Sequence, residues 1–328
     1  AREINININS IILEPEGRNT APAITLAALQ VANKFNDGIL FVLPADHLIE
    51  DINSFHKSAE VGQNLASLNK LVTFGISPKS AKTGFGYIET KSVGNKDYYK
   101  IKSFKEKPDL KTAIKYFKSK KFLWNSGMFV FKASVFIQKL NKFEPDVINC
   151  CRKSLAMSLE DKDFIRINNK EFLKCPSKSV DYALMEKINE ALVIPLKSGW
   201  NDVGSWDALI ATKEKDENEN VIEGKVIIDK VKDSFIHSSN RLVTASDVSN
   251  LIIVDTQDAL LVTSKKNTEN IKFILDKVKN KYPDVTENHR KVYRPWGYFD
   301  LIDVGSGFQT KRISVNPGAK LSLQKHQH

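Results

Sequence analysis

Two histidines close the sequence, at the end of the stretch LSLQKHQH (321–328). His326 and His328 are two positions apart, and side chains at that spacing on a strand point to the same face. Two imidazoles are half of a metal site, because a Zn or Fe centre needs further ligands. The pair therefore indicates either a solvated tail or the beginning of a metal-binding strand.

Two aspartates in separate motifs could hold a metal ion together. Asp46, in LPADHLIED (43–51), directly follows a buried strand, where α/β sheets bind ligands; capping of the next helix is the alternative. Asp202, in GWNDVGSWDAL (199–209), lies in a loop where Gly204 lets a ligand approach the backbone. A plain turn with packed tryptophans is the alternative for that loop. Because Mg²⁺ usually takes one or two carboxylates plus substrate phosphates and waters, the two motifs together suggest a Mg²⁺ site.

Three further motifs carry groups suited to a sugar phosphate. In KSFKEKPD (102–109), Glu106 can accept hydrogen bonds from sugar hydroxyls and Lys107 can bind a phosphate; a surface charge pair is the alternative. The segment TGFGYIE (83–89) could lie flat against a ring or form a hairpin. In LWNSGMFVF, Asn125 precedes an expected strand, as a sugar ligand or as an ordinary turn residue.

The stretch EPEGRNTAPAI (14–24) leads into a helix N-terminus, where free backbone N–H groups favour anions and polar ligands. A helix cap alone would account for Thr20. It would not account for Glu14, Arg18 and Asn19 together, so we interpret the segment as ligand-binding.

The elements that position these motifs alternate between strands and helices up to about residue 208. The continuous apolar run GILFVL (38–43) is typical of a parallel strand covered on both faces, and it follows a helical pattern over 21–35. Further strands are expected at 70–76, 98–107 and 126–132, and helices at 54–67, 109–118, 133–142 and 179–190. This succession predicts an α/β layered domain.

Beyond residue 212 the composition changes to charged residues and then to short, closely spaced strands. They predict a β-rich arm, closed by a helix over 267–282. A new unit begins near 293–302, with too few residues left for an independent core. The expected domains are residues 1–211, 212–288 and 289–328.

Composition excludes several classes of function. The net charge is +10, but only eight of 49 basic residues are Arg and the lysines are scattered, which argues against a nucleic-acid footprint. No apolar run reaches the roughly 20 residues of a membrane span, and the first residues do not form a secretion signal. Cys150, Cys151 and Cys175 form no CxxC motif and suit a reducing cytosol, so we expect a cytoplasmic protein.

The motifs, in this order, resemble those of the mannose-1-phosphate guanylyltransferases, or GDP-mannose pyrophosphorylases, in particular the long bacterial form fused to a type II phosphomannose isomerase. The matching stretches are EPEGRNTAPAI, LPADHLI, TGFGYIE, FKEKP, WNSGMFVF, SVDYAL, GWNDVGSW, RPWGYFDLI and ISVNPGAKLSLQKHQH. The resemblance covers essentially the whole chain. It implies a Rossmann-like, GT-A-type nucleotidyltransferase domain, then a left-handed β-helix-like arm, then the start of a cupin barrel.

The resemblance also implies a role for each candidate residue. Asp46 and Asp202 would bind the catalytic Mg²⁺, and Lys107 would complete the catalytic set. The sugar phosphate would be bound by Gly86, Tyr87, Glu106, Lys107 and Asn125, and the nucleotide by Glu14, Arg18, Asn19 and Thr20. His326 and His328 would be an incomplete cupin metal site, for Zn²⁺ or a similar divalent metal in a complete domain only.

The implied reaction joins GTP and mannose 1-phosphate into GDP-mannose and pyrophosphate. A phosphate oxygen of the sugar attacks the α-phosphorus of GTP in line, while Mg²⁺ and Lys107 neutralise the developing charge. No nucleic acid or membrane is an expected partner, and a homo-oligomer is compatible with the family. A complete parent enzyme would also interconvert mannose 6-phosphate and fructose 6-phosphate.

The chain departs from the family pattern at both ends. The family's first strand and glycine-rich loop, GGxGxRLWP, precede the matched region, so we expect a fragment with an unpaired or vacant sheet position and little activity of its own. The alternatives are a non-catalytic paralogue that binds sugar nucleotides, or a pyrophosphorylase for another sugar or base. The coding sequence on either side would separate a fragment from a paralogue.

Overall fold

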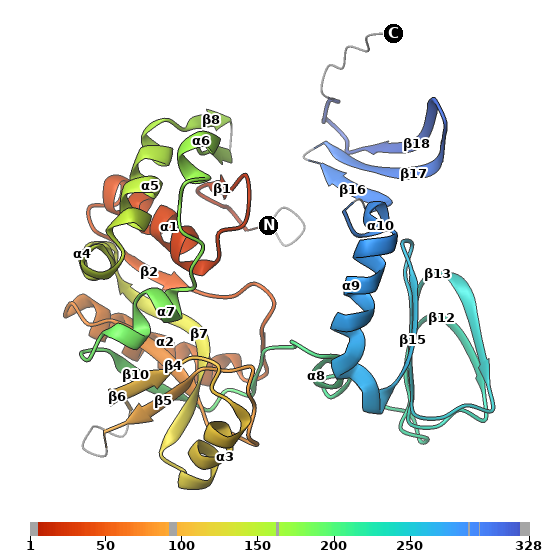
Figure 1. The fold of residues 1–328 in the computed structure, drawn as a ribbon, viewed down its shortest axis with the longest axis horizontal. Coiled ribbons are helices and arrows are strands. Elements are labelled where there is room, and N and C mark those ends of the chain that lie inside the picture. The colour runs from red at the N-terminus through yellow and green to blue at the C-terminus, as the bar shows by residue number, and fades with distance from the viewer. Residues whose placement is uncertain (1–5, 92–96, 162–163, 288, 295, 322–328) are drawn as a thin grey trace. The chain divides into compact units, whose positions relative to one another are not determined.

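The computed structural model describes residues 6–91, 97–161, 164–287, 289–294 and 296–321 (Figure 1). The chain divides into two compact units, Ala1–Asp202 and Val203–His328. Helix α8 (Trp206–Ile210), which we expected in the first domain, contributes Ile210 to a core with Val221 and Phe235 in the second unit. The finer boundaries at residues 211 and 288 stay predictions.

A six-stranded mixed sheet with the order β2-β7-β4-β10-β6-β5 forms the centre of the first unit. Its strands are β2 (Ile39–Val42), β4 (Val72–Ile76), β5 (Tyr87–Thr90), β6 (Tyr99–Lys105), β7 (Phe122–Lys132) and β10 (Leu192–Leu196). Only β4 and β10 pair in parallel, and β7 runs antiparallel to β2, β4 and β5. The long β7 therefore organises the sheet.

Alternating residues of β7 face two separate cores, as the two-residue period of a strand requires. Phe129 and Phe131 pack in the core that includes helices α1 (Thr20–Lys34), α4 (Ala133–Phe143) and α5 (Pro145–Ala156). Met128 and Val130 pack in the core with α2 (Ile52–Ser67) and α3 (Leu110–Ser119). Both faces of the sheet are thus covered by helices, which confirms the α/β layered domain.

Strand β2 corrects one expectation about the sheet. We expected a parallel strand covered on both faces, but β2 pairs antiparallel with β7, and only Leu40 of its four residues is buried. Hydrophobicity reports burial and carries no information on the direction of the partner strand. Among the described residues β2 is the last strand at its end of the sheet.

The segment after residue 178 corrects another expectation. In place of one helix over 179–190, it contains α7 (Val180–Ala183) and the 3₁₀ helix η2 (Met185–Lys187), separated by Leu184 with φ −131° and ψ −54°. The pattern had also missed α5 and a small sheet. That sheet has the order β1-β9-β8, with β1 (Ile11–Leu13), β9 (Phe164–Arg166) and β8 (Leu159–Asp161), and α6 (Asn169–Phe172) follows it.

A buried carboxylate ties this segment to the helices. Glu144, between α4 and α5, accepts hydrogen bonds from Lys178 at 2.8 and 2.9 Å and from Lys187 at 2.6 Å. Although burial opposes it, these contacts hold the pKa of Glu144 below its ordinary value. Glu144 thereby fixes the chain on either side of α7.

The second unit begins with a β-rich arm. Strands β12 (Val221–Asp229), β13 (Phe235–Ser246) and β14 (Leu251–Asp255) pair in parallel, and β15 (Leu260–Ser264) pairs antiparallel with β14. Where the sequence predicted only short strands, β13 is a single strand of 12 residues. Short connections between parallel neighbours require a coiled chain path, as in a β-helix, because a flat parallel pair needs a long crossover.

The rest of the second unit is a helical segment and a small sheet. The 3₁₀ helix η3 (Lys265–Asn270) leads into α9 (Ile271–Lys281) and α10 (Pro283–Glu287), and β16 (Lys291–Arg294), β17 (Gly297–Gly305) and β18 (Phe308–Val315) form an antiparallel sheet. In the described part of the chain no helix is both long enough and apolar enough to cross a membrane.

Candidate active site

A buried glutamate lies at the end of β6. Glu106 follows the last residue of the strand and is 8% exposed, and its Oε2 atom has no hydrogen-bond partner among the described residues. A Cβ atom built on Gly86 would lie 2.4 Å from Oε2. Only glycine therefore fits beside this carboxyl group, and an unpaired buried oxygen calls for a ligand.

Asn125 lies next to this carboxyl group, inside β7 and not before it as we expected. Its backbone N–H donates to the carbonyl of Gly86 at 2.8 Å, and its side chain is 8% exposed. Its Nδ2 atom donates to Oδ1 of Asp181 at 2.9 Å, and its Oδ1 atom accepts from the Thr73 hydroxyl at 3.1 Å. The amide is thus held from two sides.

The electrostatics of this group favour a neutral glutamic acid. Burial, and then the charge of Asp181, raise the pKa of Glu106 to about 7, against the opposing charge of Lys107. Burial also raises the pKa of Asp181. The Lys107 ammonium lies 3.6 Å from Oε1 of Glu106 and its side chain is 59% exposed, so it can reach a second anion.

Tyr87 has a supporting position in this site. Its side chain is fully buried, and its hydroxyl donates to the Lys82 carbonyl at 2.9 Å and accepts from the Lys82 amide at 3.0 Å. Tyr87 therefore anchors the loop before β5 and, in this structure, exposes no surface to a sugar.

The two aspartates of the expected metal site flank His47. Strands β3 (Leu48–Ile49) and β11 (Trp200–Asn201) pair antiparallel, which brings the ends of both motifs together. The Trp200 indole N–H donates to Nδ1 of His47 at 3.1 Å. Burial lowers the pKa of His47, and the charges of Asp46 and Asp202 oppose this. The two carboxylates are thus neighbours of one imidazole.

The helix-cap alternative for Asp46 is wrong, because Asp51 caps α2 by accepting from the Ser54 amide at 2.9 Å. The loop before β11 is equally constrained. Gly199 has φ 64°, and a Cβ there would lie 2.4 Å from Oε2 of Glu50. These constraints hold the aspartate loops in place without using either carboxylate.

Two carboxylates are oxygen ligands of the kind that Mg²⁺ prefers, and Mg²⁺ usually keeps waters and substrate phosphates as its other ligands. No group of three or more His, Cys, Asp or Glu side chains within the described ranges is arranged to hold a metal ion. The pair therefore suits a substrate-bridged Mg²⁺ better than a closed structural site. His326 and His328, the other expected metal ligands, lie outside the described residues.

The segment expected to bind the nucleotide, residues 14–24, contains two kinds of polar side chain: those already hydrogen-bonded within the fold and those with unpaired atoms. Asn19, with φ 68°, accepts from the Thr20 amide at 2.8 Å, and the Thr20 hydroxyl accepts from the Val180 amide at 2.9 Å. In contrast, Oε1 of Glu14 and Nε of Arg18 are buried and without a hydrogen-bond partner in the described structure. Burial raises the pKa of Glu14. Glu14 and Arg18 therefore have hydrogen-bonding capacity left for a ligand.

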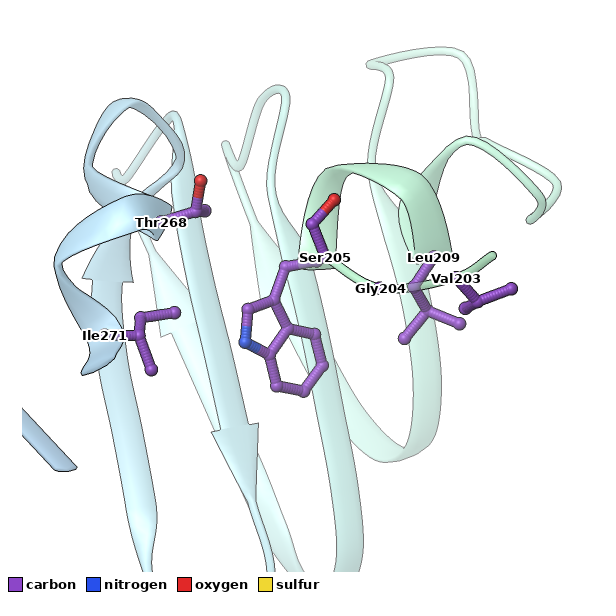
Figure 2. A pocket seen from close by; sticks show the side chains of 7 residues that line it. Val203, Gly204, Ser205, Leu209, Thr268 and Ile271 are labelled. Carbon is purple, nitrogen blue, oxygen red and sulfur yellow. The ribbon is translucent and has the colours of Figure 1, made fainter. Parts of the chain in front are cut away.

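A separate pocket of about 540 Å³ lies in the second unit. Figure 2 shows Ser205 and Leu209 on one side, from the α8 segment, and Thr268 and Ile271 on the other. Its other lining residues are Val203, Gly204 and Trp206. None of these side chains is charged.

Sequence reasoning missed Asp181, Glu186 and Thr73. The backbone N–H of Glu106 donates to Oε1 of Glu186 at 2.9 Å, so η2 supports the end of β6. The only signal in the sequence was the motif SVDYAL, whose Asp181 follows the α7 cap residue Ser179.

Comparison with known families divides the chain into three parts. Residues 1–219 match the family described as Nucleotidyl transferase, residues 224–278 the MannoseP isomerase/GMP-like beta-helix domain, and residues 281–328 the Mannose-6-phosphate isomerase C-terminal family.

Relatives of this chain include mannose-1-phosphate guanylyltransferases and a xanthan biosynthesis protein. The mannose-1-phosphate guanylyltransferase RfbM of Salmonella typhimurium is 45% identical, over 100% of this chain and 69% of that protein. The xanthan biosynthesis protein XanB of Xanthomonas campestris is 43% identical, over 100% and 69%, and the mannose-1-phosphate guanylyltransferase of Escherichia coli is 41% identical, over 100% and 70%.

Two solved structures are similar in fold. The mannose-1-phosphate geranyltransferase from Thermus thermophilus has a TM-score of 0.71 at 26% identity, covering 81% of this chain and 77% of its own. The mannose-6-phosphate isomerase from Helicobacter pylori has a TM-score of 0.56 at 34% identity, covering 61% of this chain and 78% of its own.

Proposed function

The chain belongs to the nucleotidyl transferase family, and within it to the mannose-1-phosphate guanylyltransferases that also carry a mannose-6-phosphate isomerase domain, and on that premise we propose how its residues join GTP and mannose 1-phosphate. The observation that carries the proposal is the cluster around Glu106, where a buried carboxyl oxygen without a partner among the described residues faces Gly86 beside a fixed amide. Vicinal sugar hydroxyls are donors and acceptors that suit such a cluster.

The sugar phosphate is bound at the end of β6. Glu106 and Asn125 form hydrogen bonds with the mannose hydroxyls, and Gly86 leaves room for the sugar ring. Tyr87 anchors the loop before β5 through its hydrogen bonds to Lys82. Lys107 binds the phosphate as a compact charge. An exposed ammonium next to a buried carboxyl group, whose raised pKa favours the protonated form, is free to do so.

The nucleotide is bound by the segment before α1. Glu14 and Arg18 supply the groups that recognise the base, because their buried Oε1 and Nε atoms are unpaired in the described structure. Asn19 and Thr20 shape the segment through the helix cap and the bond to Val180. A carboxylate can accept from the two adjacent N–H groups that guanine presents, which uracil and thymine lack.

Transfer is an in-line displacement. A phosphate oxygen of mannose 1-phosphate forms a bond to the α-phosphorus of GTP as the bond to the leaving pyrophosphate breaks, and no protein nucleophile takes part. Both matched families generally use divalent metals, and here Asp46 and Asp202 would hold Mg²⁺. When bound, Mg²⁺ neutralises charge that develops on the phosphates. Lys107 adds a second positive charge on the sugar side.

Pyrophosphate release by the full-length enzyme across a matrix of nucleotides and sugar phosphates tests the assignment. GTP with mannose 1-phosphate should give the highest kcat/KM. A preference for UTP or dTTP with glucose 1-phosphate would reject the guanine and mannose assignment, and binding of both substrates without turnover would indicate a non-catalytic protein.

A further inference from the structure

Asp181 is the second residue of α7. It contacts the candidate sugar site through the side-chain amide of Asn125. Its Oδ1 atom accepts from Nδ2 of Asn125 at 2.9 Å. On the other side, the fully buried Thr73 hydroxyl lies 3.1 Å from Oδ1 of Asn125 and 2.9 Å from the Met128 carbonyl. A hydroxyl has one proton, so Thr73 cannot donate fully to both oxygens.

This competition makes the amide orientation depend on Asp181. If Asp181 were protonated, it could donate to a turned Asn125 amide, whose Nδ2 would then donate to Thr73, leaving the Thr73 proton for Met128. An ionised Asp181 accepts only, and so requires the NH₂ group of Asn125 to face it. The charge state of Asp181 therefore selects which end of the Asn125 amide faces Asp181 and which faces Thr73.

The same carboxylate acts on Glu106. Burial of Glu106, with the negative charge of Asp181 next in importance and that of Glu186 also adding, favours the neutral acid, and Lys107 opposes them. Lys105 lies 3.6 Å from Glu186 and reduces the effect of that carboxylate. Two neighbouring buried carboxyls do not both ionise readily, so the pair holds one proton more easily than none.

We propose that Asp181 is a positioning residue for the sugar phosphate: its hydrogen bond orients the Asn125 amide, and its negative charge favours a proton on Glu106. This inference rests on the proposed function of the site. A neutral Glu106 can both donate to and accept from a sugar hydroxyl, whereas the ionised form only accepts. It also leaves the Lys107 ammonium free for the phosphate, because an ionised carboxylate 3.6 Å away would compete for it.

The replacement Asp181→Asn tests the proposal, because it keeps the size of the side chain and removes the charge. Removing the charge should lower the titration midpoint of Glu106 by about one pH unit, a roughly tenfold change in proton affinity. If only the neutral form binds mannose 1-phosphate, the competent fraction near pH 7 falls from about one half to about one eleventh. KM for mannose 1-phosphate should then rise about fivefold at pH 7, remain unchanged near pH 5, and KM for GTP should stay constant.

A readout independent of turnover is the ¹³C carboxyl signal of Glu106 in glutamate-labelled protein, assigned by its loss in Glu106→Gln. Its midpoint should lie lower in Asp181→Asn than in the parent chain. Glu190→Gln is the matched control, because it removes one carboxylate from an 82% exposed position and should leave the midpoint and KM unchanged. In a Glu106→Gln background, Asp181→Asn should no longer change the pH dependence of KM.

An unchanged Glu106 midpoint in Asp181→Asn would overturn the inference and leave the proposed function intact. Absence of GDP-mannose synthesis by the full-length enzyme would instead count against the proposed function, while the titration would still decide whether Asp181 controls Glu106. If Asp181→Asn fails to fold, the pH dependence of KM in Glu106→Gln decides: a profile with the parent's midpoint near pH 7 would overturn the inference.

Discussion

Replacement of Gly86 by alanine should weaken sugar phosphate binding without unfolding the domain. The backbone at Gly86 is outside the left-handed region, so alanine can adopt it. The new Cβ would lie 2.4 Å from Oε2 of Glu106 and 3.3 Å from Cβ of Asn125, and the flexible carboxyl end must move first. The added methyl group therefore acts directly on the group proposed to bind the sugar.

The expected magnitude follows from the cost of overpacking. Forcing an extra carbon into a filled site costs about 1–3 kcal/mol, and each 1.4 kcal/mol is a factor of about ten in affinity. If most of this cost falls on the bound state, KM for mannose 1-phosphate should rise about 10- to 100-fold. KM for GTP should change far less, because Glu14 and Arg18 lie in a different segment.

The control is Gly84→Ala, two residues away in the same loop, where a Cβ would meet nothing within 4 Å. Steady-state kinetics with each substrate varied in turn, together with thermal unfolding, separate binding from stability. If Gly86→Ala and Gly84→Ala had the same KM for mannose 1-phosphate, the assignment of Glu106 and Gly86 to the sugar would be refuted.

Three further predictions concern other parts of the chain. Asp202→Asn should lower kcat about 100-fold or more and raise the Mg²⁺ concentration needed for half-activity, while Asp207→Asn, an exposed change in α8, should do neither. Glu144→Gln should lower the unfolding free energy by about 1–2 kcal/mol at pH 7. The pKa of Glu144 is lowered in the folded state, so its ionised form contributes fully to the unfolding free energy above the ordinary pKa of 4.5. This contribution is lost as the pH falls through the folded pKa. The unfolding free energies of the parent chain and the variant, measured with urea, should therefore become equal in acid. Gly199→Ala should destabilise the fold by about 1–3 kcal/mol, since it combines φ 64° with a clash against Glu50, and an unchanged melting temperature would contradict this.

The sequence was informative where a local rule decides the structure. Helical spacing over 21–35 corresponds to α1 (Thr20–Lys34), and the strand expected over 98–107 corresponds to β6 (Tyr99–Lys105), which ends just before Glu106. The sequence was uninformative where the structure depends on which distant strands pair with each other. Periodicity could not tell that β2 pairs antiparallel with β7, or that Asn125 lies inside that strand, because both depend on residues far away in the chain.

The site shows the same division between residue type and context. Motifs identified Glu106 and Lys107 as suited to a sugar phosphate, but the value of Glu106 comes from its burial and from Asp181, much later in the sequence. The carboxyl group alone would have an ordinary acidity. Burial at the end of β6, together with the charge of Asp181 in α7, raises its pKa to about 7, so that it can donate as well as accept near neutral pH.

Hydrogen-bonding capacity distinguishes Glu14 and Arg18, which we propose to bind the nucleotide, from their neighbours Asn19 and Thr20. Asn19 and Thr20 belong to the same motif as Glu14 and Arg18, yet their polar groups are already used for the helix cap and for Val180. Glu14 and Arg18 keep buried atoms unpaired within the described structure, as Glu106 does, and each such atom costs about 1–3 kcal/mol if nothing binds it. Such a cost in the unliganded protein is tolerated where a bound ligand pairs with the atom. The base and the sugar of a nucleotide sugar are therefore the groups that we expect to complete these positions.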